Sequence, residues 1–414
     1  MNILHTSDWH LGRKLYGRNR YEEFQQCLDW FVEQIDIQHI DVLLIAGDIF
    51  DTTAPTHRAQ AMYYDFLCRV ATSSCQHIVI IGGNHDSPSF LHAPSEILKQ
   101  LQVHVIASVE QQAIEDEVII LKNSEGVPVL IVCAVPFLRD RDMRLVEAGE
   151  SIADKERKLA QAIAQHYDDV ADISLQHQQI HQKTTGHRLP IMAMGHLFAA
   201  DGKTIEGDGV RDLYVGSLAH VPASAFPDAF DYVALGHLHV PQKVGGYEHI
   251  RYSGSPLPMG FGEAEQTKIY HLLSYHDDTI HIENIPIPVF QRLQMVRGNW
   301  QKIEAAIQVL CQQEASIWLE VQYTSDEIIA DLREQIDALV ENSAVEVLRV
   351  KNNQTLIPVL ASSEQQERLD ELEPLDVFNR CLIQHAVPES QQDDLRKSFQ
   401  HLINQMTEHD QLAE

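Results

Sequence analysis

Several features that define other classes of protein are missing from this sequence of 414 residues. It has no apolar run of roughly 18 residues, so we expect no membrane-spanning helix, and the apolar stretch after Met1 is too short for a signal peptide. It has no G-x-x-x-x-G-K-[ST] loop, so we expect no ATP site in this chain. The six cysteines form no C-x-x-C pair and show no nucleophile setting, which indicates buried thiols in a reducing cytoplasm.

Basic residues are also scarce. The chain has 31 Lys and Arg residues but 60 Asp and Glu residues, and the net charge is −29. Such a charge disfavours tight binding of nucleic acid by the chain alone, because nucleic acid normally contacts a basic face. Local basic clusters remain as candidate nucleic-acid contacts, with a solvated surface as the alternative: Arg13, Lys14, Arg18, Arg20, Arg139, Arg141 and Arg144.

What the sequence does contain is an ordered set of six motifs rich in Asp, Asn and His. They are Asp8-x-His10, Gly47-Asp48-x-x-Asp51, Gly83-Asn84-His85-Asp86, Gly195-His196, Gly236-His237 and His237-x-His239. Carboxylate oxygens, an amide oxygen and imidazole nitrogens together suit Mn²⁺, Fe²⁺ or Zn²⁺. These ligands are too many for one ion, whereas two ions that share Asp48 would use them all. Paired ions roughly 3.5–4 Å apart activate water and neutralise a phosphate ester, so the motifs favour a two-metal phosphoesterase.

Each motif follows a short apolar run, and such runs predict buried strands. The runs are Asn2–His5, Val42–Ala46, His77–Ile81, Ile191–Met194 and Tyr232–Leu235. The candidate ligands would then lie past the carboxyl ends of strands, where open α/β sheets bind their ligands. Any one of these dipeptides could be an ordinary turn in a chain with 23 histidines. The ordered set, with every motif at a strand end, favours the metal site.

The motif set resembles the signature of the calcineurin-like metallophosphoesterases, which is D-x-H, G-D-x-x-D, G-N-H-[DE], H and G-H-x-H. The resemblance implies an α/β fold in which a two-sheet β-sandwich is flanked by helices. More particular segments resemble the nuclease subunits of bacterial double-strand-break repair complexes. These segments are Met1–Gly12, Ala46–Asp51, Pro136–Arg139 and Arg251–Pro256. The resemblance extends over essentially the whole chain, and the ligand pattern shows no departure from it.

The resemblance also implies a role for each motif residue. One ion would be held by Asp8, His10, Asp48 and His239, and the other by Asp48, Asn84, His196 and His237. His85 would face the phosphate and assist the leaving oxygen, and Asp86 would orient His85 from behind. Asp51 would lie behind the ligands, with a loop cap as an equal alternative. Water activated by both ions would attack phosphorus without a covalent intermediate. We expect Mn²⁺, although the ligand types also fit Fe²⁺ or Zn²⁺.

The sequence predicts four segments: a phosphoesterase domain over 1–286, an α/β capping domain over 287–352, a linker over 353–373 and a helical segment over 374–407. Pro286 and Pro288 mark the first boundary. The next segment has a strand–helix–strand–helix–strand pattern, which suffices for a small domain. Its predicted elements are Phe290–Val296, Asn299–Gln312, Ile317–Tyr323, Ser325–Glu341 and Val345–Lys351. Helices are also predicted over 57–75, 88–101 and 154–167.

Partners follow from the resemblance rather than from the residues. It implies a homodimer built by the helices over 57–75 and 88–101, within a heterotetramer. The helical segment over 374–407 would bind the coiled-coil base of an ATPase subunit, or else dock on its own chain. The expected activities are 3′-to-5′ exonuclease on double-stranded ends and endonuclease on single strands and hairpins, in DNA repair, recombination and replication near the nucleoid. A small-molecule phosphoesterase and a scaffold with an inactive site are the alternatives.

Overall fold

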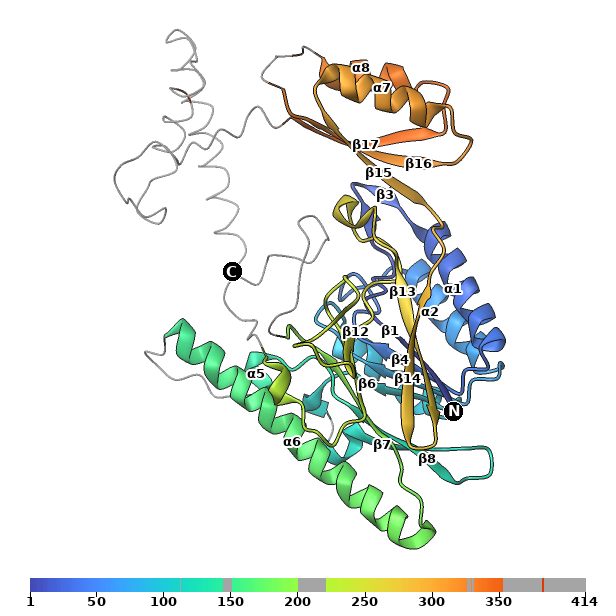
Figure 1. Ribbon diagram of the computed structural model, residues 1–414, viewed down its shortest axis with the longest axis vertical. Helices are drawn as coiled ribbons and strands as arrows, with labels where there is room; N and C mark the ends of the chain where they lie inside the picture. The colour runs from blue at the N-terminus through green and yellow to red at the C-terminus, as the bar shows by residue number, and fades with distance from the viewer. Residues whose placement is uncertain are drawn as a thin grey trace.

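The computed structural model describes residues 1–111, 113–143, 151–199, 221–325, 329, 331–352 and 382. Within this part of the chain, two six-stranded sheets form a sandwich flanked by helices, and a three-stranded sheet follows (Figure 1). No helix in the described ranges is both long enough and apolar enough to cross a bilayer. The predicted linker over 353–373 and helical segment over 374–407 lie outside the described residues, apart from Leu382.

The first sheet has the strand order β14-β13-β1-β4-β5-β6. Its strands β1, β4, β5 and β6 are parallel, and β13 and β14 pair antiparallel at one edge. The bounds are β1 Asn2–Thr6, β4 Val42–Ala46, β5 His77–Ile81, β6 Val103–Ile106, β13 Ile269–His276 and β14 Thr279–Pro286. Every residue of β4 and β5 is buried, which explains their continuous apolar sequences, because a parallel strand inside a sandwich is covered on both faces.

The second sheet has the order β11-β12-β10-β9-β8-β7. Its central strands β12, β10, β9 and β8 are parallel, and β7 and β11 pair antiparallel at the edges. The bounds are β7 Val118–Lys122, β8 Pro128–Ala134, β9 Ile191–His196, β10 Tyr232–Gly236, β11 Gln242–Lys243 and β12 Ile250–Tyr252.

One apolar layer lies between the two sheets, and a further layer covers the outer face of each. Residues such as Leu44, Val79, Val132 and Met194 fill the space between the sheets. The first sheet packs on α1 and α2, and the second packs on α6. The helices of the sandwich are α1 Tyr21–Ile37, α2 His57–Val70, α3 Pro88–His92, α4 Ser95–Lys99, α5 Asp140–Met143 and α6 Ile152–Thr185.

The helix α6 is much longer than the predicted helix over 154–167. It begins after Ser151, whose side chain accepts a hydrogen bond from Asp154 N, and ends at Thr185, just before Gly186 with a φ of 80°. Its apolar face, which includes Leu159, Ile163, Tyr167 and Val170, packs on the second sheet. The expectation of buried cysteines holds for Cys27, Cys75 and Cys133, but Cys311 is only partly buried and Cys68 is exposed.

The three-stranded sheet is parallel, in the order β15-β16-β17, and carries α7 and α8 (Figure 1). The bounds are β15 Arg292–Gly298, α7 Trp300–Cys311, β16 Ile317–Tyr323, α8 Leu332–Val340 and β17 Val345–Asn352. This sheet meets the sandwich through an apolar cluster of Leu15, Phe261, Leu293 and Trp318. The hairpin of β2 (Lys14–Leu15) and β3 (Arg18–Asn19) also contacts the three-stranded sheet. Arg349 Nη1 on β17 donates a hydrogen bond to Tyr16 Oη in the hairpin turn at 2.6 Å. The domain division at residue 286 remains a prediction.

Candidate metal centre

The six motifs meet where strands of both sheets end. Asp8, Asp48 and Asn84 follow β1, β4 and β5 of the first sheet, while His196 and His237 lie at the ends of β9 and β10 of the second. Hydrogen bonds join the two sets. His196 Nδ1 lies 2.9 Å from the carbonyl oxygen of Ala46, and His237 N donates to Asp8 Oδ1 at 2.9 Å. The centre is therefore assembled by the packing of the two sheets.

The ligand atoms fall into two buried groups, Asp8 with His10 and His239, and Asp48 with His196 and His237. Asp48 lies between the groups. Its Oδ2 is 3.6 Å from His10 Nε2 and 3.4 Å from His196 Nε2. One carboxylate oxygen thus faces both groups, as a ligand shared by two ions must.

The ligand atoms of the centre lie within hydrogen-bond distance of one another. Asn84 Oδ1 lies 2.9 Å from His196 Nε2 and 3.0 Å from His237 Nδ1. His10 Nε2 and His239 Nε2 are 3.1 Å apart. When His196 is neutral and Nδ1 donates to Ala46 O, its ring presents a lone pair at Nε2 to another lone pair on Asn84. Cations between these atoms would remove the repulsion, so the residues fit divalent metal ions.

Burial and neighbouring charges shift the pKa values of two histidines of the centre in opposite directions. Burial lowers the pKa of His237 to about 3. Burial also acts to lower the pKa of His196, but the charge of Asp48 outweighs it and brings that pKa to about 9. Without metal, the centre therefore holds a proton on His196, at the position where a divalent cation would replace it.

Four of the clustered residues have unusual backbone conformations. The φ angles are 53° at Asp8, 48° at His10, 51° at Asp48 and 105° at His237. Such angles cost about 1–3 kcal/mol each for residues other than glycine, and they occur at functional sites. Backbone hydrogen bonds hold them, including Asp8 N to Gly47 O at 3.0 Å and His10 N to Asp48 O at 3.0 Å.

Two motif glycines allow the loops to approach one another. A Cβ atom on Gly83 would lie 2.2 Å from Asp48 N, and one on Gly236 would lie 1.9 Å from Ala46 O. Neither position could hold a side chain without moving backbone. These glycines therefore set the distance between the loops that carry the ligands.

His85 lies beside the two groups and is only partly buried. Its backbone N–H donates to Asp48 Oδ1 at 2.9 Å, and its Nδ1 donates to the carbonyl oxygen of Asp51 at 2.8 Å. Asp51 Oδ1 also accepts from Arg13 at 3.1 Å and lies 3.6 Å from His10 Nδ1. The His85 ring is thus held by the backbone carbonyl oxygen of Asp51, while the Asp51 carboxylate contacts Arg13 and His10.

The expectation that Asp86 orients His85 is wrong. The carboxylate of Asp86 accepts hydrogen bonds from three backbone N–H groups, those of Ile49 at 3.1 Å, Phe50 at 3.0 Å and Gly83 at 2.9 Å. Burial, followed by the charge of Asp48, raises the pKa of Asp86 to about 6. Asp86 therefore ties the loop after β4 to the loop after β5.

Asp86→Asn is expected to destabilise the metal-free protein by about 1–3 kcal/mol, because one buried N–H group would face an amide N–H₂ instead of an oxygen. Urea unfolding of the metal-free protein measures the change. Asp277→Asn is the matched control, since the Asp277 side chain is 88% exposed and surface changes usually stay within about 0.5 kcal/mol. Equal stability of the two variants would contradict the role assigned to Asp86.

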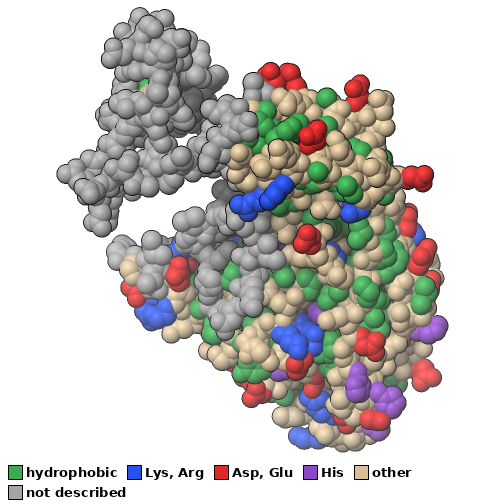
Figure 2. Space-filling model, turned by 45° about the horizontal axis from the view of Figure 1, so that its top comes forward, with side chains coloured by type: hydrophobic (Ala, Val, Ile, Leu, Met, Phe, Trp, Pro, Cys, Tyr) green, Lys and Arg blue, Asp and Glu red, His purple; other side chains and the backbone are tan. Residues whose placement is uncertain are grey.

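The predicted basic contacts need a correction at Arg20. This residue is only 2% exposed, and its Nε donates to Glu23 Oε2 at 2.7 Å, so it has no free face for nucleic acid. Arg13 pairs with Asp51, and Arg18 lies 3.3 Å from Glu346. Lys14 is exposed and Arg139 is half-buried, while Arg144 and the Arg141 side chain lie outside the described residues. On the face in Figure 2, Lys and Arg form a few small groups among Asp and Glu.

Two residues that adjoin the cluster, Glu263 and Lys268, carry no signal in the sequence. Glu263 Oε1 is 3.4 Å from His239 Nδ1, and Glu263 Oε2 pairs with Lys268. Burial acts to raise the pKa of Glu263, but Lys268 and His239 bring it below its ordinary value. Neither residue lies in a metal-ligand motif, so only the folded chain reveals their position.

Comparisons with known proteins agree with this geometry. The family model described as calcineurin-like phosphoesterase matches residues 1–241, and the model described as Type 5 capsule protein repressor C-terminal domain matches residues 289–386. The SbcD subunit of nuclease SbcCD from Escherichia coli K12 is 37% identical over 403 residues, covering 96% of this chain and 97% of that protein. Its counterpart from Bacillus subtilis is 34% identical over 65% of this chain and 64% of that protein.

A solved dimetal phosphatase from Danio rerio superposes with a TM-score of 0.38 and 9% identity, over 70% of this chain and 96% of that chain; the match is too distant to support a conclusion. The family models and the sequence relatives suffice. They confirm the expected fold class and a centre for divalent metal ions. The chain therefore belongs to the calcineurin-like phosphoesterases and, within them, to the SbcD family of nuclease subunits.

Proposed function

We propose that this chain is the metal-dependent nuclease subunit of an ATP-driven complex and hydrolyses phosphodiester bonds of DNA. The observation that carries the proposal is the position of Asp48, whose Oδ2 faces both ligand groups, at 3.6 Å from His10 Nε2 and 3.4 Å from His196 Nε2. The relatives named as nuclease subunits supply the substrate class. A phosphodiester is the substrate that a paired divalent centre of this kind suits.

In this proposal each group of ligands holds one ion. Asp8, His10, Asp48 and His239 hold the first, and Asp48, Asn84, His196 and His237 hold the second. Bound ions would neutralise the phosphate charge and acidify a water molecule between them. Mn²⁺ is the proposed metal, because the ligand set mixes carboxylate and amide oxygens with imidazole nitrogens.

His85 acts on the leaving oxygen. Its Nδ1 donates to the Asp51 carbonyl oxygen at 2.8 Å, which leaves Nε2 as the ring nitrogen that can reach a substrate. A protonated Nε2 would donate its proton to the sugar oxygen as the bond to phosphorus breaks. The ring stacks edge-on against His10, with 4.8 Å between the ring centroids, so this proton lies close to the ligand groups.

The partners proposed for the chain are DNA, a second copy of the chain and the ATPase subunit SbcC. The net charge of −29 supports weak DNA binding by the chain alone and added affinity from the ATPase. Segment 374–407 would bind the coiled-coil base of the ATPase, and 287–352 would cap the nuclease site. Ile97 and Leu101, 73% and 41% exposed, leave apolar surface for a homodimer contact. Exonuclease polarity, hairpin opening and association with the nucleoid are predictions from the family.

A cleavage assay tests the proposal. The purified chain is incubated with Mn²⁺ and a labelled DNA hairpin, with and without the ATPase subunit and ATP, and with bis-p-nitrophenyl phosphate as a small ester. We expect DNA cleavage that requires Mn²⁺ and increases with the ATPase and ATP. Hydrolysis of the small ester without cleavage of DNA under any condition would instead identify a small-molecule phosphodiesterase.

A further inference from the structure

We propose that Glu263 is a positioning residue of the metal centre, which orients the imidazole of His239, and that Lys268 holds Glu263 in place. The inference rests on the proposed function, since it assumes that His239 binds one of two ions. It adds two residues from outside the ligand motifs to the apparatus of the centre.

The two nitrogens of the His239 ring face different neighbours. Nε2 lies 3.1 Å from His10 Nε2, inside the first ligand group, while Nδ1 lies 3.4 Å from Glu263 Oε1. A carboxylate beside Nδ1 keeps the proton on that nitrogen, so that Nε2 presents a lone pair. Pairs of this kind fix the tautomer and the orientation of metal-binding histidines, and their loss typically weakens metal binding roughly 10- to 100-fold.

Glu263 is itself fixed by Lys268. The Lys268 ammonium pairs with Glu263 Oε2 and donates to Ser255 Oγ at 3.1 Å. It also donates to the backbone carbonyl oxygen of His239 at 3.0 Å. Lys268 thus binds both the backbone of His239 and the carboxylate that contacts its ring, so the pair holds His239 at its backbone and at its ring.

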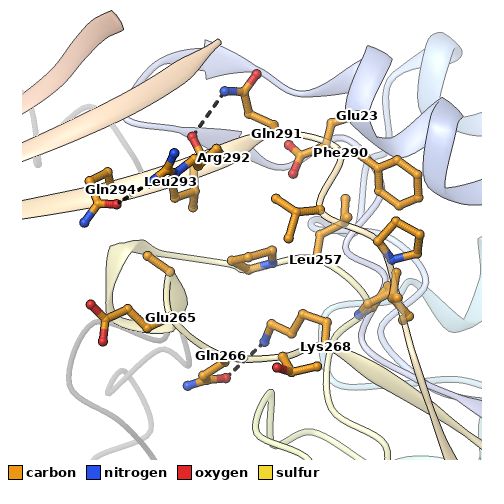
Figure 3. Close-up of a pocket in the computed structure, with 17 residues that line it drawn as sticks. Glu23, Leu257, Glu265, Gln266, Lys268, Phe290, Gln291, Arg292, Leu293 and Gln294 are labelled. Carbon is orange, nitrogen blue, oxygen red and sulfur yellow. Dashed lines mark hydrogen bonds between the residues drawn. The ribbon is translucent and has the colours of Figure 1, made fainter. Parts of the chain in front are cut away.

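The complete burial of this pair argues for a role beyond stability. Glu263 is 0% exposed and Lys268 4% exposed. Two charges lose their hydration in such a place, and an apolar pair of similar size is often equally stable. The ionic pair is explained if the carboxylate is required at His239. Lys268 and Gln266 also line a cavity of about 440 Å³ against Gln291–Gln294 (Figure 3), so a changed side chain at 268 has space to adjust.

Glu263→Gln tests the proposal because Lys268 would dictate how the new amide turns. The amide oxygen would face the Lys268 ammonium, and the amide N–H₂ would face His239 Nδ1. His239 would then carry its proton on Nε2, the nitrogen that is needed for the ion. We expect roughly 10- to 100-fold weaker binding of one Mn²⁺ and unchanged binding of the other.

The double variant Glu263→Gln/Lys268→Met should reverse part of this loss. Without Lys268, the amide is free to turn its oxygen to His239 Nδ1, and the weak site should return to within roughly tenfold of the unaltered chain. A pair with only a structural role gives no such recovery. The double variant also lacks an unpaired buried charge, so it remains informative if the single variant does not fold.

The measurements are calorimetric titration of the metal-free full chain with Mn²⁺ and the electron paramagnetic resonance spectrum, in which a coupled pair of Mn²⁺ ions differs from an isolated ion. Glu265→Gln is the matched control, because Glu265 is exposed and lies two residues away. Thermal unfolding confirms that each variant is folded. Folded Glu263→Gln that binds both ions like the unaltered chain would overturn the inference alone. An unaltered chain that binds fewer than two ions would overturn the two-metal proposal as well.

Discussion

Asp48→Asn should lose both metal ions together, because Asp48 Oδ2 lies close both to His10 Nε2, at 3.6 Å, and to His196 Nε2, at 3.4 Å. An amide at this position removes the negative charge that both ions share. Without the ions, we expect the free-energy barrier to phosphodiester hydrolysis to rise by about 4 kcal/mol, which lowers the rate roughly 1000-fold. Metal analysis of the purified variant and Mn²⁺-dependent cleavage of a DNA hairpin measure the two effects.

The comparison variant is Asp8→Asn. Asp8 belongs to the group with His10 and His239 and not to the group with His196 and His237, so this change should weaken one ion and spare the other. Both substitutions preserve side-chain size, and thermal unfolding of the metal-free proteins checks that neither disrupts the fold. Loss of a single ion in Asp48→Asn would refute the shared ligand.

His85→Ala should keep both ions and lose DNA cleavage. His85 lies beside the two groups rather than within them, and its Nδ1 is engaged by the Asp51 carbonyl oxygen at 2.8 Å. Removal of a general acid typically costs roughly 100- to 10,000-fold in rate. The loss should be much smaller with bis-p-nitrophenyl phosphate, because nitrophenolate leaves without a proton, whereas a sugar oxygen needs one. Rates on both substrates, with metal content, separate these effects.

A competing geometry makes this measurement decisive. Atoms of His85, His10 and Asp51 also lie within 4.8 Å of one another, so His85 could itself bind an ion. Metal content that falls together with activity would assign His85 as a ligand. Equal losses on both substrates would refute its role as an acid. His276→Ala serves as the control, because the His276 side chain is 79% exposed and distant from the motifs in sequence.

Much of the fold could be predicted from apolar runs. The bounds of Val42–Ala46, His77–Ile81 and Ile317–Tyr323 agree with the sequence interpretation to the residue, because each run is bounded by polar residues or glycine and largely buried. The second half of α6 escaped the prediction, since its Gln- and His-rich sequence contains few apolar residues. Some of its buried positions are polar, such as Ser174 and Gln178.

The motifs predicted the residues that cluster in the metal centre, but they did not predict the contacts of the charged residues around it. Local sequence shows which residues follow a strand, and that places Asp8, Asp48 and His196 correctly. Local sequence does not show which group a charged side chain will contact in the folded protein. Arg20 looked like part of a basic cluster, yet its guanidinium is buried against Glu23. Asp86 looked like the partner of His85, yet it accepts from three backbone groups. Both errors concern contacts that form only when the chain folds.

The assembly of the centre from both sheets has a consequence for the order of events during synthesis. A growing chain that ends before His237 contains the five earlier ligands but lacks His237 and His239; the earlier ligands are Asp8, His10, Asp48, Asn84 and His196. Hydrogen bonds such as His237 N to Asp8 Oδ1, at 2.9 Å across 229 residues, form only after β10 has joined the second sheet. A chain that ends before His237 therefore lacks a ligand of each group, and the full ligand set arises only after strands of both sheets have been made.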